Sequence, residues 1–327
     1  MNLVAALIVR NEAENLPGCV ASLGGLVDGV HVHDTGSGDG TPGIARSLGA
    51  TVSTGEWRDD FAAARNAAVE AAGRPGWVLS IDADDRAVAD PGRLRPILGS
   101  ARSAALLVPI DNLHDELPYT HHTARLFRPA AVRWEGRVHE RLATEDGVWP
   151  AVPREALHLV HHGYEDAGTR RRKAVRNADI GEAVLERLAP DADPGLVATT
   201  LLDLGRSYVG AGRGQAAVDT FERLRERTRP GDRQWVLGTD ALARLLLGAG
   251  HDDAVVFLAR QLREHGTERQ YCDWLEAQAL AQLGHAGEAW RLLQGVRQVV
   301  DPAGRAYPPT HLAELKRLLG ELVAVLR

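Results

Sequence analysis

Cysteine is scarce in this sequence: Cys19 and Cys272 are the only two in 327 residues. Two cysteines that lie this far apart exclude a disulfide framework and a cysteine-rich zinc site. We expect both to be small, buried residues in a reducing environment, and we therefore predict a cytoplasmic protein.

An excess of one charge and long apolar runs are also lacking. The formal net charge is −6, with 25% charged and 44% apolar residues. This balance excludes disorder and the general basic surface of a nucleic-acid-binding protein, so no nucleic-acid partner is expected. The first apolar run, Leu3–Val9, has no basic leader and is too short for a signal peptide or a membrane span. We interpret it as a buried strand and expect no membrane span.

Short β-rich runs alternate with helical patterns in the first half of the chain. This alternation predicts a mostly parallel sheet covered by helices, which is an α/β fold. The expected strands are Leu3–Val9, Gly29–His33, Thr51–Thr54, Trp77–Ile81 and Ala104–Ile110, and the expected helices between them are Glu12–Leu23, Thr41–Leu48 and Asp59–Ala72. Two later runs, His122–Phe127 and Val132–Glu140, are expected to form antiparallel or edge strands.

The second half is almost entirely helical from Thr169 onward, so we predict an α/β domain over residues 1–168 and an all-α domain over residues 169–327. Similar turns lie around Gly212, Gly250 and Gly284, at intervals of 38 and 34 residues. Helix–turn–helix units of this length are typical of tetratricopeptide repeats. A plain helical bundle is the alternative.

Three carboxylates follow the apolar run that begins at Trp77. In WVLSIDADDR, Asp82, Asp84 and Asp85 come at the end of a predicted central strand, where an open α/β sheet faces a ligand. Carboxylates this close repel one another and require a counter-charge. Mg²⁺ or Mn²⁺, which take oxygen ligands, would supply it. The alternative is an acidic turn, and Asp85 either supports the ligands or caps a following helix.

Polar segments also follow or separate the other predicted strands. IVRNEAENL ends the first strand, and HDTGSGDGT ends the second with a glycine-rich turn that suits an anion at a helix N-terminus. The same turn could equally be a simple helix start capped by Asp39 or Thr41. In EWRDDFAAARNAAVEAA, Arg65 and Asn66 interrupt an alanine-rich helix, where such a pair is often only the solvent face.

Taken in order, these segments resemble the family 2 glycosyltransferases with the GT-A nucleotide-sugar fold. The resemblance is closest to bacterial members that carry a tetratricopeptide domain behind the catalytic one. It covers the first half of the chain and rests on LIVRNEAENL, VHDTGSGDGT, EWRDDFAAARNAAVE, WVLSIDADD, VRWEGRVHE and HLVHHGY.

The resemblance implies roles for several residues that bind the donor. Nucleotide-sugar contacts are implied for Val9, Asn11 and Glu12 around the nucleobase, Asp34 against the base, Arg65 at the side of the nucleotide and Asp82 at the ribose. The divalent metal is implied at Asp84, and His161, at the family's H-x-G-Y position, would complete its shell. A structural histidine is the alternative for His161.

A catalytic base is expected in WEGRVHERL, because an inverting transferase must remove a proton from the attacking acceptor. Glu140 is the first candidate, with Asp111 and His139 as rivals. The sequence departs here from the commoner Glu-Asp pair of the family. The alternative is an exposed strand end that pairs with Arg137 or Arg141.

The sequence therefore predicts a metal-dependent, inverting, hexosyltransferase-like glycosyltransferase. The expected donor is a nucleotide diphosphate sugar, with UDP as the nucleotide, and the expected acceptor is a peptide, a protein or a small molecule. Aromatic residues, at 5% of the chain, form no obvious platform for stacking on a sugar. A homodimer through the helical repeats is a further hypothesis.

Other functions could use similar residues. A nucleotidyltransferase also grips a nucleotide with carboxylates and Mg²⁺, and the chain could instead be a non-catalytic helical-repeat binding module with a vestigial nucleotide-binding domain. A phosphohydrolase with D-x-D-x-T/V is disfavoured, because Arg86 occupies the last position of that motif. The basic run Arg170–Lys173 could cover a pyrophosphate or simply begin a solvated helix.

Overall fold

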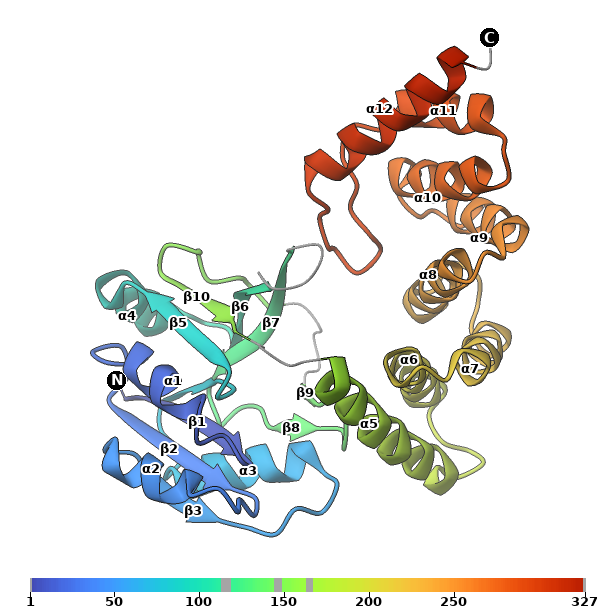
Figure 1. The fold of residues 1–327 in the computed structure, drawn as a ribbon. Coiled ribbons are helices and arrows are strands. Elements are labelled where there is room, and N and C mark those ends of the chain that lie inside the picture. The colour runs from blue at the N-terminus through green and yellow to red at the C-terminus, as the bar shows by residue number, and fades with distance from the viewer. Residues whose placement is uncertain (1, 113–118, 144–148, 163–166, 326–327) are drawn as a thin grey trace. The chain divides into compact units, whose positions relative to one another are not determined.

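The computed structural model describes residues 2–112, 119–143, 149–162 and 167–325. The chain divides into two compact units, residues 1–164 and residues 165–327 (Figure 1). The first is an α/β unit and the second is helical, so the predicted fold classes are confirmed. The boundary placed between residues 168 and 169 stays a prediction.

The α/β unit is built on a mostly parallel sheet of eight strands in the order β3-β2-β1-β4-β7-β6-β10-β5. The adjacent strands β3, β2, β1 and β4 are parallel to one another, and β10 is parallel to β6. Strand β7 is antiparallel to both of its neighbours, β4 and β6, and the edge strand β5 is antiparallel to β10. The strands are β1 (Leu3–Val9), β2 (Gly29–Asp34), β3 (Thr51–Thr54), β4 (Trp77–Ser80), β5 (Asp85–Ala89), β6 (Ala105–Asn112), β7 (Tyr119–Phe127) and β10 (Leu157–His161).

Alternation along β1 explains how its two faces are covered. Leu3, Ala5 and Leu7 point into one apolar core, whereas Ala6 and Ile8 pack on the other face with the alanine-rich helix α3 (Phe61–Ala71). The remaining helices of the unit are α1 (Leu16–Ser22), α2 (Thr41–Ser47) and α4 (Pro91–Ser100). Since α3 lies against the sheet through small side chains, a polar residue on its inner face is brought close to the strands.

One predicted strand and one alternative for Asp85 differ from the structure. Val132–Glu140 was expected to be one strand, but only β8 (Trp134–Glu135) is extended there, and it pairs with β9 (Arg141–Leu142) around a turn. No helix follows Asp85, because the chain enters the edge strand β5 directly. Asp85 is therefore not a helix cap.

The helical unit is a series of helix pairs that share one core. Gly212, Gly250 and Gly284 lie in the predicted turns, with φ values of +73°, +76° and +84°. The helices are α5 (Ala167–Arg187), α6 (Pro194–Ala211), α7 (Gly214–Arg227), α8 (Arg233–Gly248), α9 (Asp252–Glu264), α10 (Arg269–Gln282), α11 (Ala286–Gln294) and α12 (Pro309–Val325). This confirms the tetratricopeptide-like repeats. Among the described residues, no helix is both long and apolar enough to cross a membrane.

Candidate active site

The polar segments predicted to act together lie at one edge of the sheet. Strands β1, β2 and β4 are parallel neighbours, and the last residues of β1 and β2, Val9 and Asp34, are paired. Because parallel strands end at the same edge, the segments that follow them converge there. This edge is the candidate active site.

Asp82 is held between two arginines. Arg65 Nη2 donates to its Oδ1 at 2.9 Å, and Arg125 Nη2 donates to its Oδ2 at 2.8 Å. Burial alone would raise the pKa of Asp82, but the charges of Arg125 and Arg65 outweigh it and lower the pKa. The counter-charge for Asp82 is thus supplied by the protein itself.

Arg65 connects Asp82 to other parts of the site. This arginine is 6% exposed; its Nε donates to Glu140 at 2.6 Å and its Nη1 to Ser80 at 3.0 Å. The neighbouring Asn66 exchanges two hydrogen bonds with the backbone of Trp134, so it fixes β8 on α3. The alternative that this pair is only the solvent face of α3 therefore does not hold.

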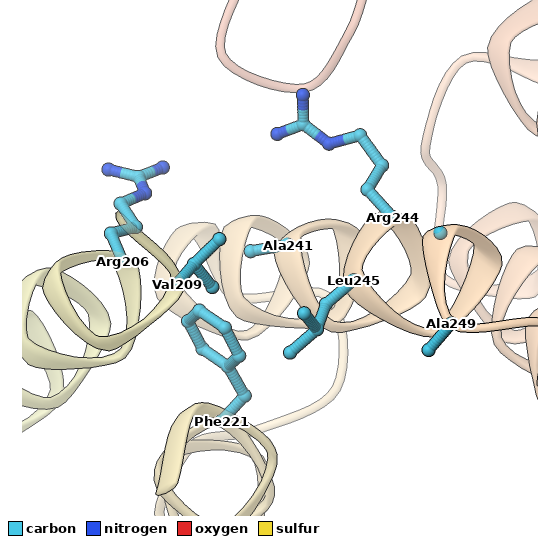
Figure 2. A pocket seen from close by; sticks show the side chains of 8 residues that line it. Arg206, Val209, Phe221, Ala241, Arg244, Leu245 and Ala249 are labelled. Carbon is cyan, nitrogen blue, oxygen red and sulfur yellow. The ribbon is translucent and has the colours of Figure 1, made fainter. Parts of the chain in front are cut away.

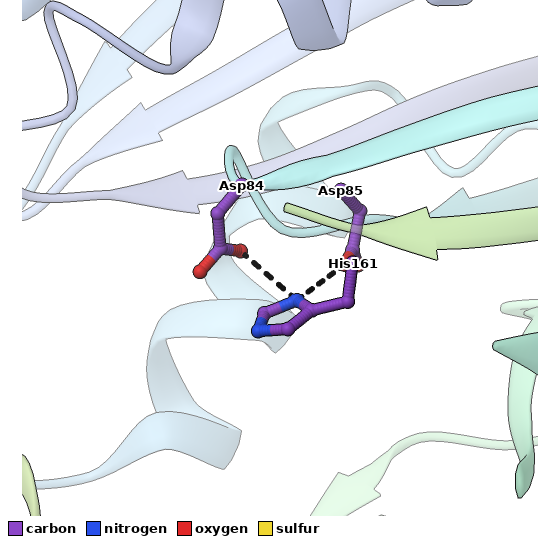
Figure 3. Close-up of side chains that lie close together, drawn as sticks. All are labelled: Asp84, Asp85 and His161. Atoms are coloured by element: carbon purple, nitrogen blue, oxygen red, sulfur yellow. Dashed lines mark hydrogen bonds and ion pairs between the residues drawn. The ribbon is translucent and has the colours of Figure 1, made fainter. Parts of the chain in front are cut away.

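Asp84, Asp85 and His161 form a cluster beside Asp82 (Figure 3). His161 Nδ1 lies 2.9 Å from Asp85 Oδ1 and 3.8 Å from Asp84 Oδ1, and one ligand atom from each residue lies within 4.8 Å of the others. The cluster arises from strand pairing, because His161 in β10 is the partner of Asp85 in β5.

The donor set of this cluster fits a divalent cation. Two carboxylates and one imidazole suit Mn²⁺, and the carboxylate oxygens suit Mg²⁺. The His161 side chain is 39% exposed, whereas that of Asp85 is 3% exposed, so the cluster has one open side. The hydrogen bond to Asp85 raises the pKa of His161; burial opposes this shift, and the charge of Asp84 adds to it. A bound cation would replace that proton.

The ends of β1 and β2 are tied together by their loops. Asn11, at φ +58°, donates its backbone N–H to Ser37 Oγ and accepts from Gly38 N–H, both at 2.8 Å. The backbone N–H of Glu12 donates to Thr41 Oγ1 at 2.9 Å. The two loops therefore act as one structure beside the buried Val9.

Asp34 holds its own turn. Its carboxylate accepts the backbone N–H groups of Gly36 and Ser37, each at 3.0 Å, and the Ser37 hydroxyl. Asp34 is 3% exposed. Asp34 lies at the end of β2, the position for which the resemblance implies a nucleobase contact. Its hydrogen bonds in this structure stabilise the loop that follows β2.

The three candidate bases lie in different surroundings. Glu140 reaches the site through Arg65, and His139 is exposed in the turn between β8 and β9, with φ +53°. Asp111 is bound by Arg154 and accepts from Thr120 at 2.7 Å. It lies 3.9 Å from His158, which alternation places on the opposite face of β10 from His161. The structure therefore brings Glu140, but not Asp111, to the candidate site.

Sequence reasoning missed Arg125. Leu106 in β6 pairs with Leu126, but the next residue, Leu107, pairs with Ala124, so β7 carries one extra residue at Arg125. Such a bulge turns a side chain away from the alternation of its strand. The available signal was an arginine within a predicted edge strand, next to the apolar residues that end it; the bulge itself has no sequence signature here. Ser80 and the pairing role of Asp85 were also missed.

Residues 5–141 match the family model described as Glycosyl transferase family 2. The α/β unit carries a family 2 glycosyltransferase domain. The matched segment contains the ends of β1, β2 and β4 and reaches Glu140, whereas His161 lies beyond it.

A relative of known sequence covers part of the chain. A TPR repeat-containing protein of Synechococcus elongatus is 36% identical over 168 residues, which are 48% of this chain and 41% of that protein. The chain thus spans less than half the length of that relative.

Two solved structures show low similarity to this chain. Glucosyl-3-phosphoglycerate synthase of Mycobacterium tuberculosis, solved with Mn²⁺ and UDP-glucose, has a TM-score of 0.30 and 17% identity, covering 75% of this chain and 78% of that one. The TPR-like repeats of a putative kinesin light chain from Podospora anserina have a TM-score of 0.34 and 19% identity, covering 39% of this chain and 68% of that one.

Proposed function

We propose that the family 2 domain transfers a sugar from a nucleoside diphosphate sugar to an acceptor with inversion at the anomeric carbon. The observation that carries this proposal is the corner at the end of β4. There Asp82 is locked by two arginines beside the carboxylate–imidazole cluster of Asp84, Asp85 and His161. UDP is the proposed nucleotide.

Asp84, Asp85 and His161 are the residues proposed to hold Mg²⁺ or Mn²⁺. A divalent cation there would offset the charge of the diphosphate leaving group. In addition to Asp84 and His161, the proposal now includes Asp85, because its carboxylate orients the His161 ring at 2.9 Å.

The nucleotide is proposed to lie along the tied loops of β1 and β2. Val9, Asn11, Glu12 and Asp34 would contact the nucleobase, and the Asn11–Gly38 bond keeps the two loops in register. Arg65 would fix the nucleotide from the side while holding Asp82 toward the ribose hydroxyls. Both carboxylate oxygens of Asp82 are already oriented, so little freedom would be lost on binding.

Glu140 is the proposed base, with His139 as the rival that remains near it. In the transfer, the acceptor oxygen forms a bond to the anomeric carbon as the bond to the diphosphate breaks, and the acceptor proton passes to the base. Arg65 engages Glu140 Oε1, which leaves Oε2 as the oxygen proposed to take the proton. The acceptor is proposed to be a peptide, a protein or a small molecule. Dimerisation through the repeats and a cytoplasmic location stay predictions.

Incubation of the full chain with a panel of nucleoside diphosphate sugars and Mn²⁺ tests this function. We expect free nucleoside diphosphate to be released, and Asp84→Ala to lower the rate by about 100-fold or more. Asp253→Ala, an exposed charge change on α9, is the matched control and should leave the rate unchanged. Release of a sugar 1-phosphate would instead indicate a nucleotidyltransferase, because transfer of the nucleotidyl group leaves the sugar with one phosphate, and no product from any donor would contradict catalysis.

A further inference from the structure

Arg86, which the proposed function does not use, closes the turn that carries the cation cluster. This turn, residues 82–85, runs from the end of β4 into β5, and we call it the carboxylate turn. Arg86 Nη1 donates to two of its backbone carbonyls, Ala83 O at 3.0 Å and Asp85 O at 2.9 Å. One guanidinium nitrogen thus ties the middle of the turn to its end.

The other two carbonyls of the carboxylate turn are also engaged. Asp82 O accepts from the Cys19 thiol at 3.4 Å and from the backbone N–H of Asp85 at 3.0 Å. Asp84 O accepts at 2.8 Å from the backbone N–H of His162, the residue that follows β10. Because each carbonyl has a donor, the backbone of the turn has little freedom. The directions of its carboxylates are therefore set before any ligand binds.

The contacts of Arg86 are to backbone oxygens and not to carboxylates. Arg86 follows three aspartates in the sequence, but in the described part of the chain it forms no ion pair with any of them. Asp82 is paired instead with Arg65 and Arg125. Arg86 therefore shapes the turn and does not neutralise it.

Gly18 in α1 makes room for the guanidinium of Arg86. A Cβ at Gly18 would lie 2.5 Å from Arg86 Nη2, 2.6 Å from Nε and 2.7 Å from Cζ. These similar distances indicate that the flat face of the guanidinium lies against the helix at this point. A glycine inside a helix costs about 0.5–1 kcal/mol relative to alanine, and the close approach of Arg86 accounts for its presence here.

Helix α1 holds the chain around the carboxylate turn at two further points. Besides the Cys19 thiol, Ser22 Oγ accepts the backbone N–H of Ala87 at 3.0 Å. The same helix follows directly on the loop proposed for the nucleobase, since Leu16 N–H donates to Glu12 O at 2.9 Å. Helix α1 therefore connects that loop to the carboxylate turn.

We propose that Arg86 is a positioning residue for the divalent cation. Seated on Gly18, it holds the carboxylate turn in the conformation that forms the cation cluster with His161. This inference rests on the proposed cation site, and it adds a residue that does not touch the cation. As a bare charge, Arg86 would have the opposite effect, because a positive charge near the site repels a cation.

Titration of the metal-free full chain with Mn²⁺ tests the inference, with free Mn²⁺ measured by electron paramagnetic resonance and no nucleotide present. Arg86→Gln removes both the charge and the guanidinium that bonds the two carbonyls. If Arg86 positions the turn, this variant should bind Mn²⁺ about 10- to 100-fold more weakly, the range for groups that orient metal ligands. If Arg86 acts only as a charge, the variant should bind Mn²⁺ more tightly.

A control variant makes the same chemical change in the helical unit. Arg206 is an exposed arginine of α6, and its guanidinium extends away from the helices beside Val209 (Figure 2). Arg206→Gln should bind Mn²⁺ with the affinity of the wild type.

Gly18→Ala tests the same contact from the side of the helix. It keeps the charge of Arg86 but displaces the guanidinium, which is the flexible end of its side chain, so the chain is expected to fold. Mn²⁺ binding should weaken by about 10-fold or more. Gly99→Ala in α4, where nothing lies within 4 Å of the added Cβ, is the matched control and should bind Mn²⁺ as the wild type does.

Amide hydrogen exchange of the metal-free chain separates a local effect from a general loss of stability. In Arg86→Gln and Gly18→Ala, exchange should become about 10-fold faster or more in residues 82–87, as the loss of a hydrogen bond predicts. Exchange in β1 should stay at the rate of the wild type.

The outcomes distinguish this inference from the proposed function. Mn²⁺ binding that is unchanged or tighter in Arg86→Gln, or unchanged in Gly18→Ala, would overturn the inference and leave the cation site in place. Mn²⁺ affinity of the wild type equal to that of Asp84→Ala would overturn the cation site and the inference with it. Exchange that is faster in β1 as much as in the carboxylate turn would show a general loss of stability and would also overturn the inference.

Discussion

Among single residues, those of the acidic corner carry less uncompensated charge than the sequence suggests. Asp82 is neutralised by Arg65 and Arg125, and Asp85 is bonded to His161. Repulsion among the three carboxylates is therefore a weaker argument for a bound metal than the sequence alone suggested. The donor set of Asp84, Asp85 and His161 is what still favours a cation.

Asp111 was a candidate base, and its contacts indicate that it stabilises the fold instead. The hydrogen bonds from Arg154 hold its pKa below the usual value, against a smaller opposing effect of burial. Because the native pKa is lowered, this ion pair contributes stability above about pH 4, and the contribution is lost as the pH falls through the native pKa. Asp111→Asn should lower the free energy of unfolding by about 1–3 kcal/mol at pH 7 and flatten its fall toward acid pH.

Urea unfolding between pH 3 and pH 7 measures this effect. The rate of sugar transfer by Asp111→Asn should stay within about threefold of wild type, since the carboxylate does not lie with Glu140. Loss of the acid limb of the pH–rate profile in this variant, the fall in rate at low pH as the base is protonated, would show that Asp111, and not Glu140, is the base.

Glu140 is expected to behave in the opposite way. Glu140→Gln keeps a side chain that can still meet Arg65, but it removes the group that takes the proton, so kcat should fall by about 10²- to 10⁴-fold with little change in KM for the donor. Steady-state kinetics checks this split. His139→Ala is the neighbouring control, and a larger loss there than in Glu140→Gln would reverse the assignment.

Among the strands and helices, those with continuous patterns were predictable and the short edge pieces were not. Leu3–Val9 and Thr51–Thr54 were predicted with their final bounds. The first is an apolar run that ends at Arg10, and the second is a short run rich in β-branched residues that ends at Gly55, so their ends left little choice. The strand β5 is short and lies at the sheet edge, and only its partner β10 makes it a strand. The position of Asp85 opposite His161 depends on that pairing and could not be derived from local sequence.

Some residues of the candidate site were predictable from the sequence and others were not. The carboxylates and His161 were predictable because they follow strands in a pattern typical of the family. Arg125 was not, since its place depends on a bulge between β6 and β7 that inserts one residue. The ion pair of Glu140 with Arg65 joins positions far apart in the sequence and likewise required the fold.

Helix packing in the repeats can be tested with two glycines. A Cβ at Gly205 would lie 2.4 Å from Phe221 Cε1, and Phe221 is fully buried, so Gly205→Ala should destabilise the helical unit by about 1–3 kcal/mol. Nothing lies within 4 Å of a Cβ at Gly287 in α11. Gly287→Ala should therefore stabilise by about 0.4–1 kcal/mol.

Thermal unfolding of the two variants measures both effects, and each variant adds the same single methyl group. A midpoint for Gly205→Ala equal to that of wild type would show that Phe221 can move aside, and would contradict tight packing between α6 and α7.

In the molecule as a whole, the chain combines a family 2 glycosyltransferase domain with a helical-repeat unit. The candidate active site is the corner of carboxylates, arginines and His161 at the sheet edge of the first unit. Fold class and domain order followed from patterning across the chain, whereas the pairing that brings His161 to Asp85 required the fold.

A divalent cation at Asp84, Asp85 and His161 is proposed to couple the family 2 domain to its nucleotide. Isothermal titration calorimetry of UDP with the full chain, once with Mn²⁺ and once with excess chelator, is the decisive measurement. We predict binding that is at least about 10-fold tighter with Mn²⁺ and that His161→Ala loses this gain, while His158→Ala, on the other face of the same strand, keeps it. UDP affinity that is the same with chelator, or the same in His161→Ala as in the wild type, would show that the cluster does not bind a cation for the nucleotide.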